Sequence, residues 1–407
     1  MPQKPTFYYG WIIVFLAFMS ISTYGLFFSY SVFLEPLEAE FHCSRTAISA
    51  AYMIYMIVYG SCAVPMGWFS DKYGPRKPLW LAAFLIGSGI CLCSTMTSIW
   101  QLYLFFGVIA SIGHGAVFVV PISTVNRWFT QRRGLAVGIA ACGLGLGLLV
   151  VPPVAAQIII TYGWRVAFII LGSTFFVING IVGTFIKRSP ENEGLRPLKE
   201  IGGETSAPKS SSLNIKDFTV AETLKTKAFW ILYLVCVFCF GAEQMALVHI
   251  VAYSGEIGIS PTEAALGLSL LGVGTIIGRV GTGALSDRKG RVLILTICCF
   301  IEAASIFSLT AITSLPMLYL IMFFLGFGYG GWAALCPAML GDFFGLKNLG
   351  RIMGVWFTGS IPAGVLGPLM GGIVFDSTRS YLWAFLFGGI MCTAAAISAA
   401  LIKSPQK

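Results

Sequence analysis

One arginine, Arg279, interrupts a segment that is otherwise typical of a membrane-spanning helix, Ala264–Ser286. A cation at the centre of a bilayer costs about 3 kcal/mol on insertion scales, and such residues usually face a water-filled path or a partner of opposite charge. The guanidinium is a planar fork of donors that matches a carboxylate. Arg279 is therefore either an anion-binding group or one half of a structural ion pair with a buried acid on a neighbouring helix.

Four further ionisable residues lie inside apolar segments. Glu243 and His249 share one segment and are candidates for carrying a proton, although Glu243 could equally neutralise Arg279. His114 lies in an earlier segment, and Glu302 lies in a later one. Each histidine is also consistent with a neutral ring that is hydrogen-bonded between helices, so both interpretations stay open.

The composition is that of an integral membrane protein, because 57% of the 407 residues are hydrophobic and only 11% are charged. A spanning helix needs about 20 apolar residues. The chain contains twelve such runs, which predict an all-α membrane protein with twelve transmembrane helices. The runs are centred near Phe15, Ile57, Phe84, Val108, Leu144, Ser173, Val237, Leu271, Phe300, Phe324, Gly364 and Gly388.

The basic residues predict how these helices are oriented. If both termini are cytoplasmic, all 26 Lys and Arg residues lie on the cytoplasmic side except Arg45, Arg165 and Arg379, which lie outside, and Arg279, which lies within a span. This asymmetry follows the positive-inside rule and predicts a multi-pass protein of the cell (inner) membrane. The net charge of +9 therefore reflects topology in the lipid bilayer and gives no evidence of nucleic-acid binding.

The eleven cysteines lie almost entirely inside spans, as in Cys91-Leu-Cys93 and Cys298-Cys299. They are interpreted as small apolar packing residues, and neither a disulfide framework nor a metal site is predicted. The chain has no phosphate-binding Gly-Lys-Ser/Thr loop and no soluble domain. ATP-driven transport is therefore excluded, and neither an enzymatic activity nor a cofactor is expected.

A polar stretch divides the twelve spans into six and six. Residues 188–226 contain no long apolar run, and residues 202–212 are rich in Gly and Ser, which is typical of a linker. We therefore predict an N-terminal six-helix bundle over residues 1–187, a cytoplasmic linker over residues 188–226 and a C-terminal six-helix bundle over residues 227–407.

Two sequence motifs occur once in each half, at closely matching separations. The first reads GWFSDKYGPRK over residues 67–77 and GALSDRKGR over residues 283–291. The second reads WFTQRRGLAVG over residues 128–138 and FFGLKNLGRIMG over residues 343–354. Duplication of a six-helix unit is typical of transporters whose two bundles rock about a site near the membrane midplane.

The first motif resembles the loop signature of the major facilitator superfamily, and the resemblance covers essentially the whole chain. It implies the major facilitator fold, with two pseudo-symmetric six-helix bundles. The glycines of the motif permit close helix contact and a tight turn, and its aspartate can accept hydrogen bonds from a helix N-terminus and from basic partners. The predicted gating residues, which would hold the cytoplasmic side shut in one state, are Asp71, Arg76, Asp287 and Arg288.

Within that superfamily, the chain resembles the monocarboxylate transporter group and its oxalate/formate antiporter relatives. The resemblance rests on Tyr9-Gly10-Trp11, which opens the first span, and on residues 128–143, which enter the fifth. It implies that Arg279 is the substrate arginine of span 8. Thr275, one turn earlier, departs from the animal members, which carry an acid there. Residues 354–375 in span 11 contain no second cation of the kind that a dicarboxylate exchanger would need.

The resemblance also implies that spans 1, 4, 7 and 10 line the cavity. Span 9, which holds Glu302, would belong to an outer scaffold, so this carboxyl is expected to be structural. Arg279 alone neutralises a monoanion, whereas a dianion would leave an uncompensated charge. The predicted substrate-binding residues are Arg279, Tyr24, Phe28, Phe118, His249 and Tyr329, and the proton-coupling candidates are Glu243 and His249.

Together these features predict a secondary active transporter that moves a small monocarboxylate, such as lactate or pyruvate, with a proton by alternating access. It would act as a monomer and without a cofactor, and it would not be an enzyme. Three alternatives stay open. One is an anion exchanger of oxalate/formate type without net proton movement, and another is a membrane receptor that senses a carboxylate through a transporter fold. The third is a drug or sugar exporter.

Overall fold

The computed structural model describes residues 9–43, 45–129, 132–191, 217–256, 258–259, 261–378 and 380–405. Within these residues every regular element is a helix, as expected for segments that must satisfy their backbone hydrogen bonds internally in a bilayer. Twelve helical segments of the described chain are long and apolar enough to cross a membrane. The predicted number of spans is therefore confirmed.

The first six spans form one bundle. Its helices are α1 (Tyr9–Ser22), α2 (Gly25–Phe28), α3 (Tyr30–Phe41), α4 (Arg45–Tyr73), α5 (Arg76–Cys93), α6 (Ile99–Leu102), the π-helix η1 (Tyr103–Ala110), α7 (Ser111–Val117), α8 (Val119–Trp128), α9 (Arg133–Ala141), α10 (Gly143–Tyr162) and α11 (Trp164–Phe185). The short helix α12 (Val220–Leu224) precedes the second bundle.

The last six spans form the second bundle. Its helices are α13 (Lys227–Glu256), α14 (Pro261–Lys289), α15 (Arg291–Leu309), α16 (Leu315–Phe344), α17 (Leu349–Phe357), α18 (Ser360–Thr378) and α19 (Leu382–Ala400). The predicted linker includes residues 192–216, which lie outside the described residues. The domain boundaries assigned from the sequence therefore stay a prediction.

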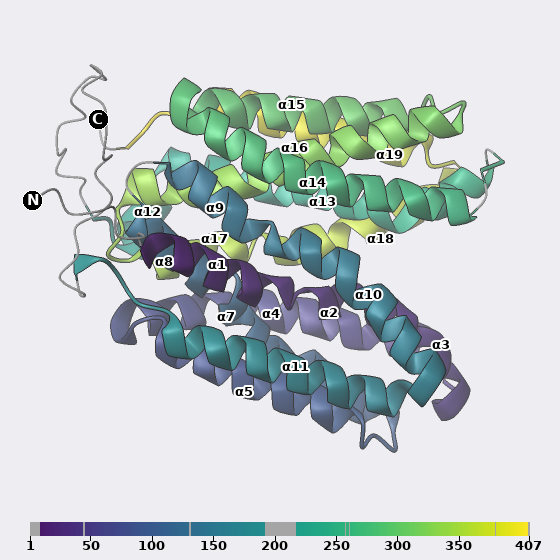
Figure 1. Ribbon diagram of the computed structural model, residues 1–407. Coiled ribbons are helices and arrows are strands. Elements are labelled where there is room, and N and C mark those ends of the chain that lie inside the picture. The colour runs from purple at the N-terminus through teal and green to yellow at the C-terminus, as the bar shows by residue number, and fades with distance from the viewer. Residues whose placement is uncertain are drawn as a thin grey trace, which may run out of the picture.

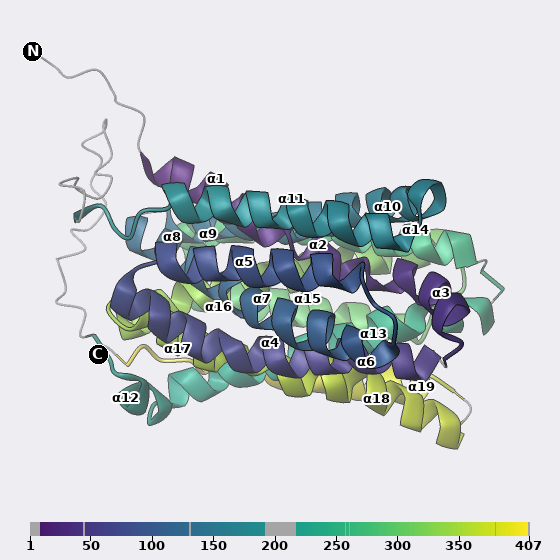
Figure 2. The same cartoon turned by 90° about the horizontal axis from the view of Figure 1, so that it is seen from below.

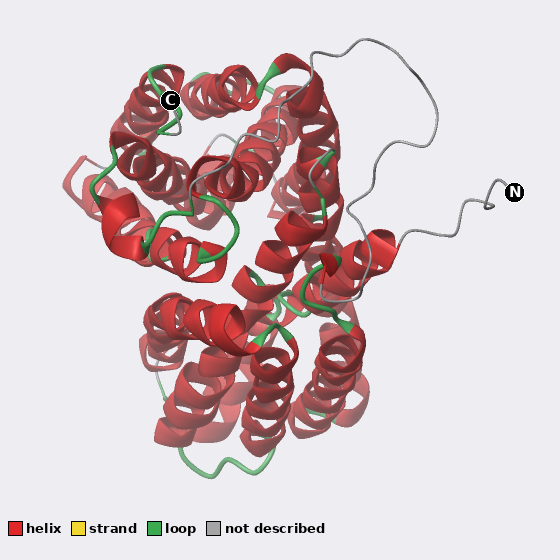
Figure 3. Ribbon diagram, turned by 90° about the vertical axis from the view of Figure 1, so that its left-hand side faces the viewer, coloured by secondary structure: helices red, strands yellow, loops and turns green. Residues whose placement is uncertain are grey.

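The two bundles lie side by side, with their helices running in the same general direction (Figure 1, Figure 3). In the N-terminal bundle α5 packs along α11, on the face remote from the other bundle (Figure 2). In the C-terminal bundle α15 packs along α19. Between the bundles, α4 packs along α17 and α9 along α14. These two crossings occupy equivalent positions in the two repeats, as expected for a pseudo-symmetric pair of bundles.

Several spans are interrupted near their middles. The interruptions lie at Thr23–Tyr24, Phe118, Cys142 and Thr358–Gly359. Pro121 and Pro362 explain two of them, because a proline lacks the N–H that would bond to the carbonyl four residues earlier, here those of Val117 and Thr358. Such interruptions place irregular backbone inside the protein, where it lines a cavity and not the lipid.

Glycines allow the bundles to approach closely at the end where α1 begins and α19 ends. A Cβ atom on Gly67 would lie 2.0 Å from the carbonyl oxygen of Gly350, and one on Gly283 would lie 2.4 Å from that of Gly134. Both distances are far below van der Waals contact, so any side chain at these positions would push the helices apart. The glycines predicted from the repeated motif to permit close contact therefore occupy the two crossings.

Asp71 joins the bundles at the crossing of α4 and α17. Its carboxylate accepts hydrogen bonds from the backbone N–H groups of Gly350 at 3.0 Å and Arg351 at 2.8 Å, in the first turn of α17. Arg127 donates to the same carboxylate at 2.5 Å, and both side chains of this ion pair are nearly buried. A negative charge at a helix N-terminus is favourable because the free N–H groups there carry partial positive charge.

Asp287 makes the equivalent contact at the crossing of α14 and α9. It accepts hydrogen bonds from the backbone N–H groups of Gly134 at 3.0 Å and Leu135 at 3.1 Å. Arg291, one turn later in the chain, pairs with it at 3.1 Å. We call these two sets of bonds, made by Asp71 and Asp287, the aspartate contacts. They join the two bundles at this end of the molecule.

Two of the four predicted gating residues have other surroundings. Arg76 donates from Nε to the carbonyl of Ile186 at 3.0 Å, within the N-terminal bundle, and Arg288 is exposed to solvent. The tight turns at Gly74 (φ 84°) and Gly290 (φ 94°) lie next to these arginines in the sequence. Neither arginine reaches an aspartate of the contacts, whose basic partners are Arg127 and Arg291.

Asp71→Asn is expected to weaken the closure of this end. The variant removes the charge that α17 and Arg127 both bind, and a hydrogen bond to a charged group contributes about 1.5–3 kcal/mol. A loss of about 2 kcal/mol would shift the closed-to-open ratio by roughly 30-fold. A reporter made by Ser286→Cys, at a residue that is 2% exposed in the α9–α14 crossing, should then react faster with an impermeant maleimide.

Asp217→Asn is the matched control. Asp217 also caps backbone N–H groups, those of Leu346 and Lys347 at 3.0 and 3.1 Å in the loop between α16 and α17. The bond of this loop to the N-terminal bundle runs from Arg127 Nε to the carbonyl of Leu346 at 3.3 Å, a group that Asp217 does not bind. The loss of Asp217 should leave the reactivity of the Ser286→Cys reporter unchanged. If Asp71→Asn also left it unchanged, Asp71 would not hold the bundles together.

Gly67→Ala is expected to open the same end by steric repulsion. The added methyl group would lie 2.0 Å from the carbonyl oxygen of Gly350, and backbone on both sides leaves no flexible side chain to yield. Gly281→Ala is the control, because a Cβ atom there meets nothing within 4 Å. Maleimide reactivity of the Ser286→Cys reporter should rise several-fold only in the Gly67→Ala variant, and equal reactivity in the two variants would contradict the steric explanation.

Candidate functional site

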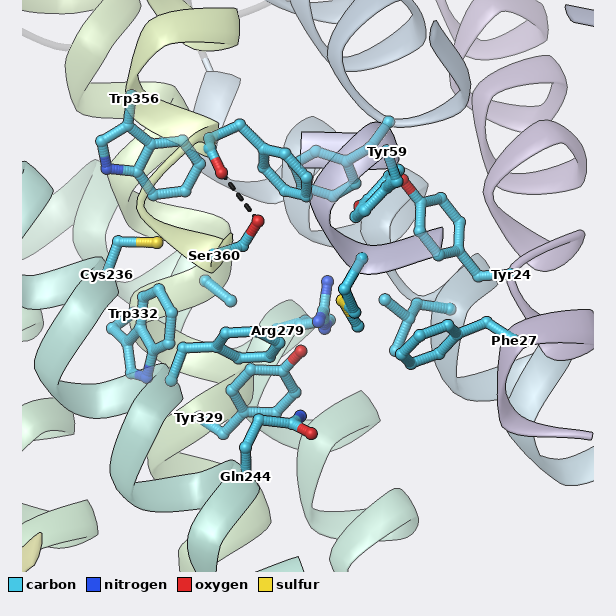
Figure 4. A pocket seen from close by; sticks show the side chains of 16 residues that line it. Tyr24, Phe27, Tyr59, Cys236, Gln244, Arg279, Tyr329, Trp332, Trp356 and Ser360 are labelled. Carbon is cyan, nitrogen blue, oxygen red and sulfur yellow. Dashed lines mark hydrogen bonds between the residues drawn. The ribbon is translucent and has the colours of Figure 1, made fainter. Parts of the chain in front are cut away.

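A central pocket lies between the bundles, at the level of the interrupted helices. It contains about 710 Å³ of empty space, part of which is open to solvent. Its walls are Tyr24, Phe27, Met56, Tyr59, Phe118 and Leu144 of the N-terminal bundle and Cys236, Phe240, Gln244, Arg279, Tyr329, Trp332, Ala333, Trp356, Phe357 and Ser360 of the C-terminal bundle. Among these described residues Arg279 is the only charged one, and more than half are aromatic (Figure 4).

Arg279 lies between the walls contributed by the two bundles (Figure 4). It is 1% exposed. Its Nη1 donates to the carbonyl oxygen of Ala141, the last residue of α9, at 3.1 Å, and its guanidinium carbon lies 5.4 Å from the ring centroid of Tyr329. Its Nε has no hydrogen-bond partner, and no carboxylate of the described residues forms an ion pair with it. The structural ion pair that the sequence left open is therefore not formed in this conformation.

Comparison of the two repeated halves shows that only the C-terminal half has an arginine at this position. A Cβ atom on Gly138 would lie 2.3 Å from the carbonyl oxygen of Arg279, and one on Gly354 would lie 2.5 Å from that of Ala63. The two contacts are equivalent in the two crossings, so Ala63 is the counterpart of Arg279. Helix packing is therefore satisfied by a small apolar residue at this position, and packing alone does not require the arginine.

Two tyrosine hydroxyls form the polar part of the N-terminal wall, on the opposite side of Arg279 from Tyr329 and Gln244 (Figure 4). The hydroxyl oxygens of Tyr24 and Tyr59 lie 2.6 Å apart. Behind them His114 is fully buried, with its ring centroid 5.6 Å from that of Tyr24. A hydroxyl or keto oxygen of a bound molecule would find donors and acceptors in this tyrosine pair.

The structure brings together four of the six predicted substrate-binding residues: Arg279, Tyr24, Phe118 and Tyr329 all line the pocket. His249 lies outside it, where its Nε2 is 2.9 Å from the carbonyl oxygen of Pro368 on α18. The placement of the Phe28 side chain lies outside the described part of the structure. The roles of all six residues in substrate binding stay predictions.

Several pocket residues were not identified from the sequence. Tyr59 and Met56 lie on span 2, and Trp356 and Ser360 lie on span 11. Neither span was among those expected to line the cavity. Gln244 follows Glu243 directly, but an uncharged residue inside an apolar span gives no sign in the sequence that it faces a pocket. The sequence does show polar or aromatic residues near the middle of spans 2 and 11. Their presence alone does not tell whether a side chain faces the pocket or a neighbouring helix.

Two buried acids lie behind the C-terminal wall. Glu243 is 2% exposed and Glu302 is 0% exposed. One oxygen of Glu243 and both oxygens of Glu302 have no hydrogen-bond partner in the described residues. Glu243 interacts electrostatically with Arg279 and with Glu302, but it forms no ion pair with Arg279. Of the two acids, Glu243 is therefore the one that interacts with Arg279.

Glu302 also belongs to a cluster with two thiols. The sulfur atoms of Cys239 on α13 and Cys392 on α19 and a carboxyl oxygen of Glu302 all lie within 4.8 Å of one another, and all three residues are buried. Thiolates and carboxylates are ligands of Zn²⁺. However, a neutral carboxyl between two thiols satisfies the same geometry, so the cluster does not by itself require a metal.

Comparison with known proteins identifies the family and several relatives. The family model described as Major Facilitator Superfamily matches residues 10–301 and 237–407. Monocarboxylate transporter 12 of Xenopus laevis is 31% identical to this chain over 97% of the chain and 89% of its own length. The oxalate:formate antiporter of Oxalobacter formigenes is 26% identical over 90% of this chain and 84% of its own length.

Solved structures of transporters share the fold at low sequence identity. The proton:xylose symporter XylE bound to 6-bromo-6-deoxy-D-glucose gives a TM-score of 0.73 at 17% identity, over 96% of this chain and 94% of the symporter. FucP in the outward conformation gives 0.71 at 15% identity, over 95% and 97% of the two chains. The matching family model, the relatives along nearly the full length and the twelve helices in two bundles lead to one conclusion: the chain belongs to the major facilitator superfamily of membrane transporters.

Proposed function

We propose that the chain is a secondary active transporter that moves a small monocarboxylate, such as lactate or pyruvate, together with a proton. The observation that carries this proposal is the position of Arg279. It is the one charged group among the described residues that line the pocket, and no carboxylate in the described part of the chain pairs with it. The name of the Xenopus laevis relative, a monocarboxylate transporter, supports the same class of substrate.

The surroundings of Arg279 suit a short organic acid with one charge. A carboxylate would bind the donor fork of the guanidinium in a bidentate way, and its single charge would neutralise the single cation. Aromatic walls such as Phe118 and Phe357 would contact an apolar carbon chain. The hydroxyls of Tyr24 and Tyr59 would bind a hydroxyl or keto oxygen at the other end of the molecule.

Alternating access would follow from the way the pocket is shared. Arg279 belongs to the C-terminal bundle and the tyrosine pair to the N-terminal bundle, so a bound substrate would contact both. The aspartate contacts would hold one end of the molecule closed while the other end exchanges substrate. Rocking of the bundles would then break these contacts and open the end that they close.

Glu243 and His249 remain the candidates for proton coupling. Glu243 is buried close enough to Arg279 to interact with it electrostatically. His249 is half-buried against α18 and faces Tyr381, with ring centroids 5.2 Å apart. Of the two, Glu243 is the better placed to respond to a charge that arrives at Arg279.

Anion exchange of the oxalate/formate kind is the second candidate function. The Oxalobacter formigenes relative, named an oxalate:formate antiporter, favours it. The single cation of the pocket argues against a dianion, because a second negative charge would stay uncompensated in a site with little water. Exchange of one monocarboxylate for another would be compatible with the same pocket.

The predicted topology completes the proposal. Both termini and the linker over residues 188–226 would lie in the cytoplasm, and the bundles over residues 1–187 and 227–407 would span the cell (inner) membrane. The start of α1 and the end of α19 lie at the same end of the molecule (Figure 1). The aspartate contacts lie at this end too, so they would close the cytoplasmic side.

Arg279→Lys is expected to lower the uptake of labelled lactate into vesicles by roughly 10- to 100-fold. Lysine keeps the charge but loses the planar fork, and a lost hydrogen bond between charged groups costs about 1.5–3 kcal/mol. Arg165→Lys is the matched control, because Arg165 is half-exposed and lies far from the pocket. It pairs with Glu40 at 3.0 Å, at the end of the molecule opposite the aspartate contacts. Near wild-type uptake in Arg279→Ala would show that Arg279 does not bind the carboxylate.

Uptake of labelled lactate should depend on a proton gradient. In vesicles that contain the wild-type protein, an inward proton gradient is expected to drive accumulation above equilibrium, because each carboxylate would enter with a proton. Without the gradient, uptake should only reach equilibrium. If accumulation were indifferent to the proton gradient but rose with a preloaded carboxylate on the other side, the exchanger would replace the symporter as the function.

A further inference from the structure

A group of basic and aromatic side chains lies beside the crossing of α4 and α17 (Figure 2). Trp68 and Tyr73, in the last turns of α4, are 40% and 46% exposed. The Nζ of Lys72 lies 5.1 Å from the centroid of each of these rings, and the Nζ of Lys77 on α5 lies 5.1 Å from that of Tyr73. The guanidinium carbon of Arg351, in the first turn of α17, lies 5.9 Å from the centroid of Trp68. We call these residues the basic patch: Trp68, Lys72, Tyr73, Lys77 and Arg351.

The indole ring of Trp68 contacts one cation from each bundle. Lys72 belongs to α4 of the N-terminal bundle, and Arg351 belongs to α17 of the C-terminal bundle. Two like charges beside one ring repel each other. The attraction of each cation to an exposed ring is weak and offsets this repulsion only in part. An anion placed among these side chains would therefore stabilise the contact between the bundles.

No acid of the described residues supplies this negative charge. In the part of the chain that the structure describes, Lys72, Lys77 and Arg351 form no ion pair with a carboxylate. Asp71, next to Lys72, is nearly buried, and its carboxylate already binds Arg127 and two backbone N–H groups of α17. The Nε of Arg351 is buried and has no hydrogen-bond partner among the described residues. The basic patch therefore gathers three cations without an acid of its own.

The crossing of α9 and α14 shows that helix packing does not require the basic patch. Leu135 is the counterpart of Arg351, because each donates its backbone N–H to the aspartate of its crossing. Ala284 is the counterpart of Trp68, because each directly follows the glycine that contacts the backbone of the opposite bundle. Two apolar side chains thus occupy the positions that a guanidinium and an indole occupy beside α4. These two residues are best explained by a partner outside the bundles.

The position of the basic patch in the membrane indicates what that partner is. The patch lies at the end of one span, Ala50–Tyr73, and at the start of another, Leu349–Phe375. Exposed Trp and Tyr side chains are enriched where a span reaches the lipid headgroups, and lysines extend toward the phosphates from the same level. The aspartate contacts lie at this end, which the predicted topology places in the cytoplasm. The cytoplasmic leaflet carries anionic headgroups that attract clusters of Lys and Arg.

We propose that the basic patch binds the phosphate headgroup of an anionic membrane lipid, and that the bound lipid stabilises the contact between α4 and α17. The proposal goes beyond the proposed function and does not depend on the substrate. The phosphate oxygens would accept hydrogen bonds from Lys72 and Arg351, and the negative charge would compensate both cations. Separation of α4 from α17 would draw one of these cations away from the headgroup. Anionic lipids would therefore favour the conformation in which the bundles are joined at this end.

The first test measures lipid binding by native mass spectrometry of the protein in detergent. The wild type is expected to retain added phosphatidylglycerol in preference to phosphatidylcholine. Lys72→Gln and Arg351→Gln should each lower the retention of phosphatidylglycerol about fivefold, because each removes one basic residue that contacts the headgroup. Lys403→Gln is the matched control. Lys403 is an exposed lysine at the same end of the molecule, but it follows α19, which packs along α13 and α15.

The second test measures the contact between the bundles with the Ser286→Cys reporter in nanodiscs. The reagent is an uncharged maleimide, so that the charge of the lipid does not change its local concentration, and labelling of residue 286 is read by peptide mass spectrometry. Labelling should be several-fold slower in an equal mixture of phosphatidylglycerol and phosphatidylcholine than in phosphatidylcholine alone. This difference should disappear with Lys72→Gln or Arg351→Gln and persist with Lys403→Gln. Each variant is compared with itself in two lipids, so a direct effect of the substitution on the crossing cancels.

Several results would overturn the proposal. Equal retention of the two lipids by the wild type, or wild-type retention of phosphatidylglycerol in both Lys72→Gln and Arg351→Gln, would place no anionic headgroup on the basic patch. Lipid binding without a change in reporter labelling would separate the lipid from the contact of α4 and α17. Slower labelling caused by inorganic phosphate in phosphatidylcholine nanodiscs would make the patch a site for a soluble anion. A dimer in place of the lipid-bound monomer would make it an interface between two copies of the chain.

Discussion

The charge of Arg279, held where bulk water cannot solvate it, is the constraint on which the surrounding structure depends. An isolated cation at this depth costs about 3 kcal/mol or more. The protein answers with the carbonyl of Ala141 at 3.1 Å and the ring face of Tyr329. Ala141 ends α9, and carbonyls at a helix C-terminus carry partial negative charge. The interruption at Cys142 therefore supplies the carbonyl that accepts from Arg279. Gly138 has no side chain and meets the backbone of Arg279 directly. This lets α9 and α14 come close enough for that hydrogen bond.

The repeat separates what packing requires from what function requires. Gly60 meets Ile361 at one crossing and Gly145 meets Ile276 at the other, so the same small-against-large contact is made with the residues exchanged between the halves. Packing is therefore conserved between the crossings even where residue identities are not. Arg279 breaks this pattern, because its counterpart Ala63 makes the equivalent backbone contact while carrying only a methyl group. A residue that packing does not need, and that is costly to bury, is best explained by a task in the pocket.

Sequence patterns predicted the parts of the structure that follow from local composition. Apolar runs predicted the twelve spans, the duplicated motif predicted the two bundles, and Asp71 between two glycines predicted a contact with a helix N-terminus. The details of the pocket depend on how each helix is rotated, and composition does not determine rotation. Tyr59 was overlooked for this reason, and His249, expected at the pocket, is turned toward Pro368. Arg76 and Arg288 likewise follow the predicted motif but face away from the aspartates.

The bond between Arg279 and Ala141 joins the two bundles, and this gives substrate binding a direct effect on their contact. A carboxylate that binds the guanidinium competes with a carbonyl that carries only a partial charge, and a full charge forms the stronger hydrogen bond. Binding would therefore weaken one bond between the bundles. A substrate long enough to reach the hydroxyls of Tyr24 and Tyr59 would replace that bond with a bridge of its own. An anion too short to do so would loosen the contact without restoring it, so the distance between the cation and the tyrosine pair would select substrates by length as well as by charge.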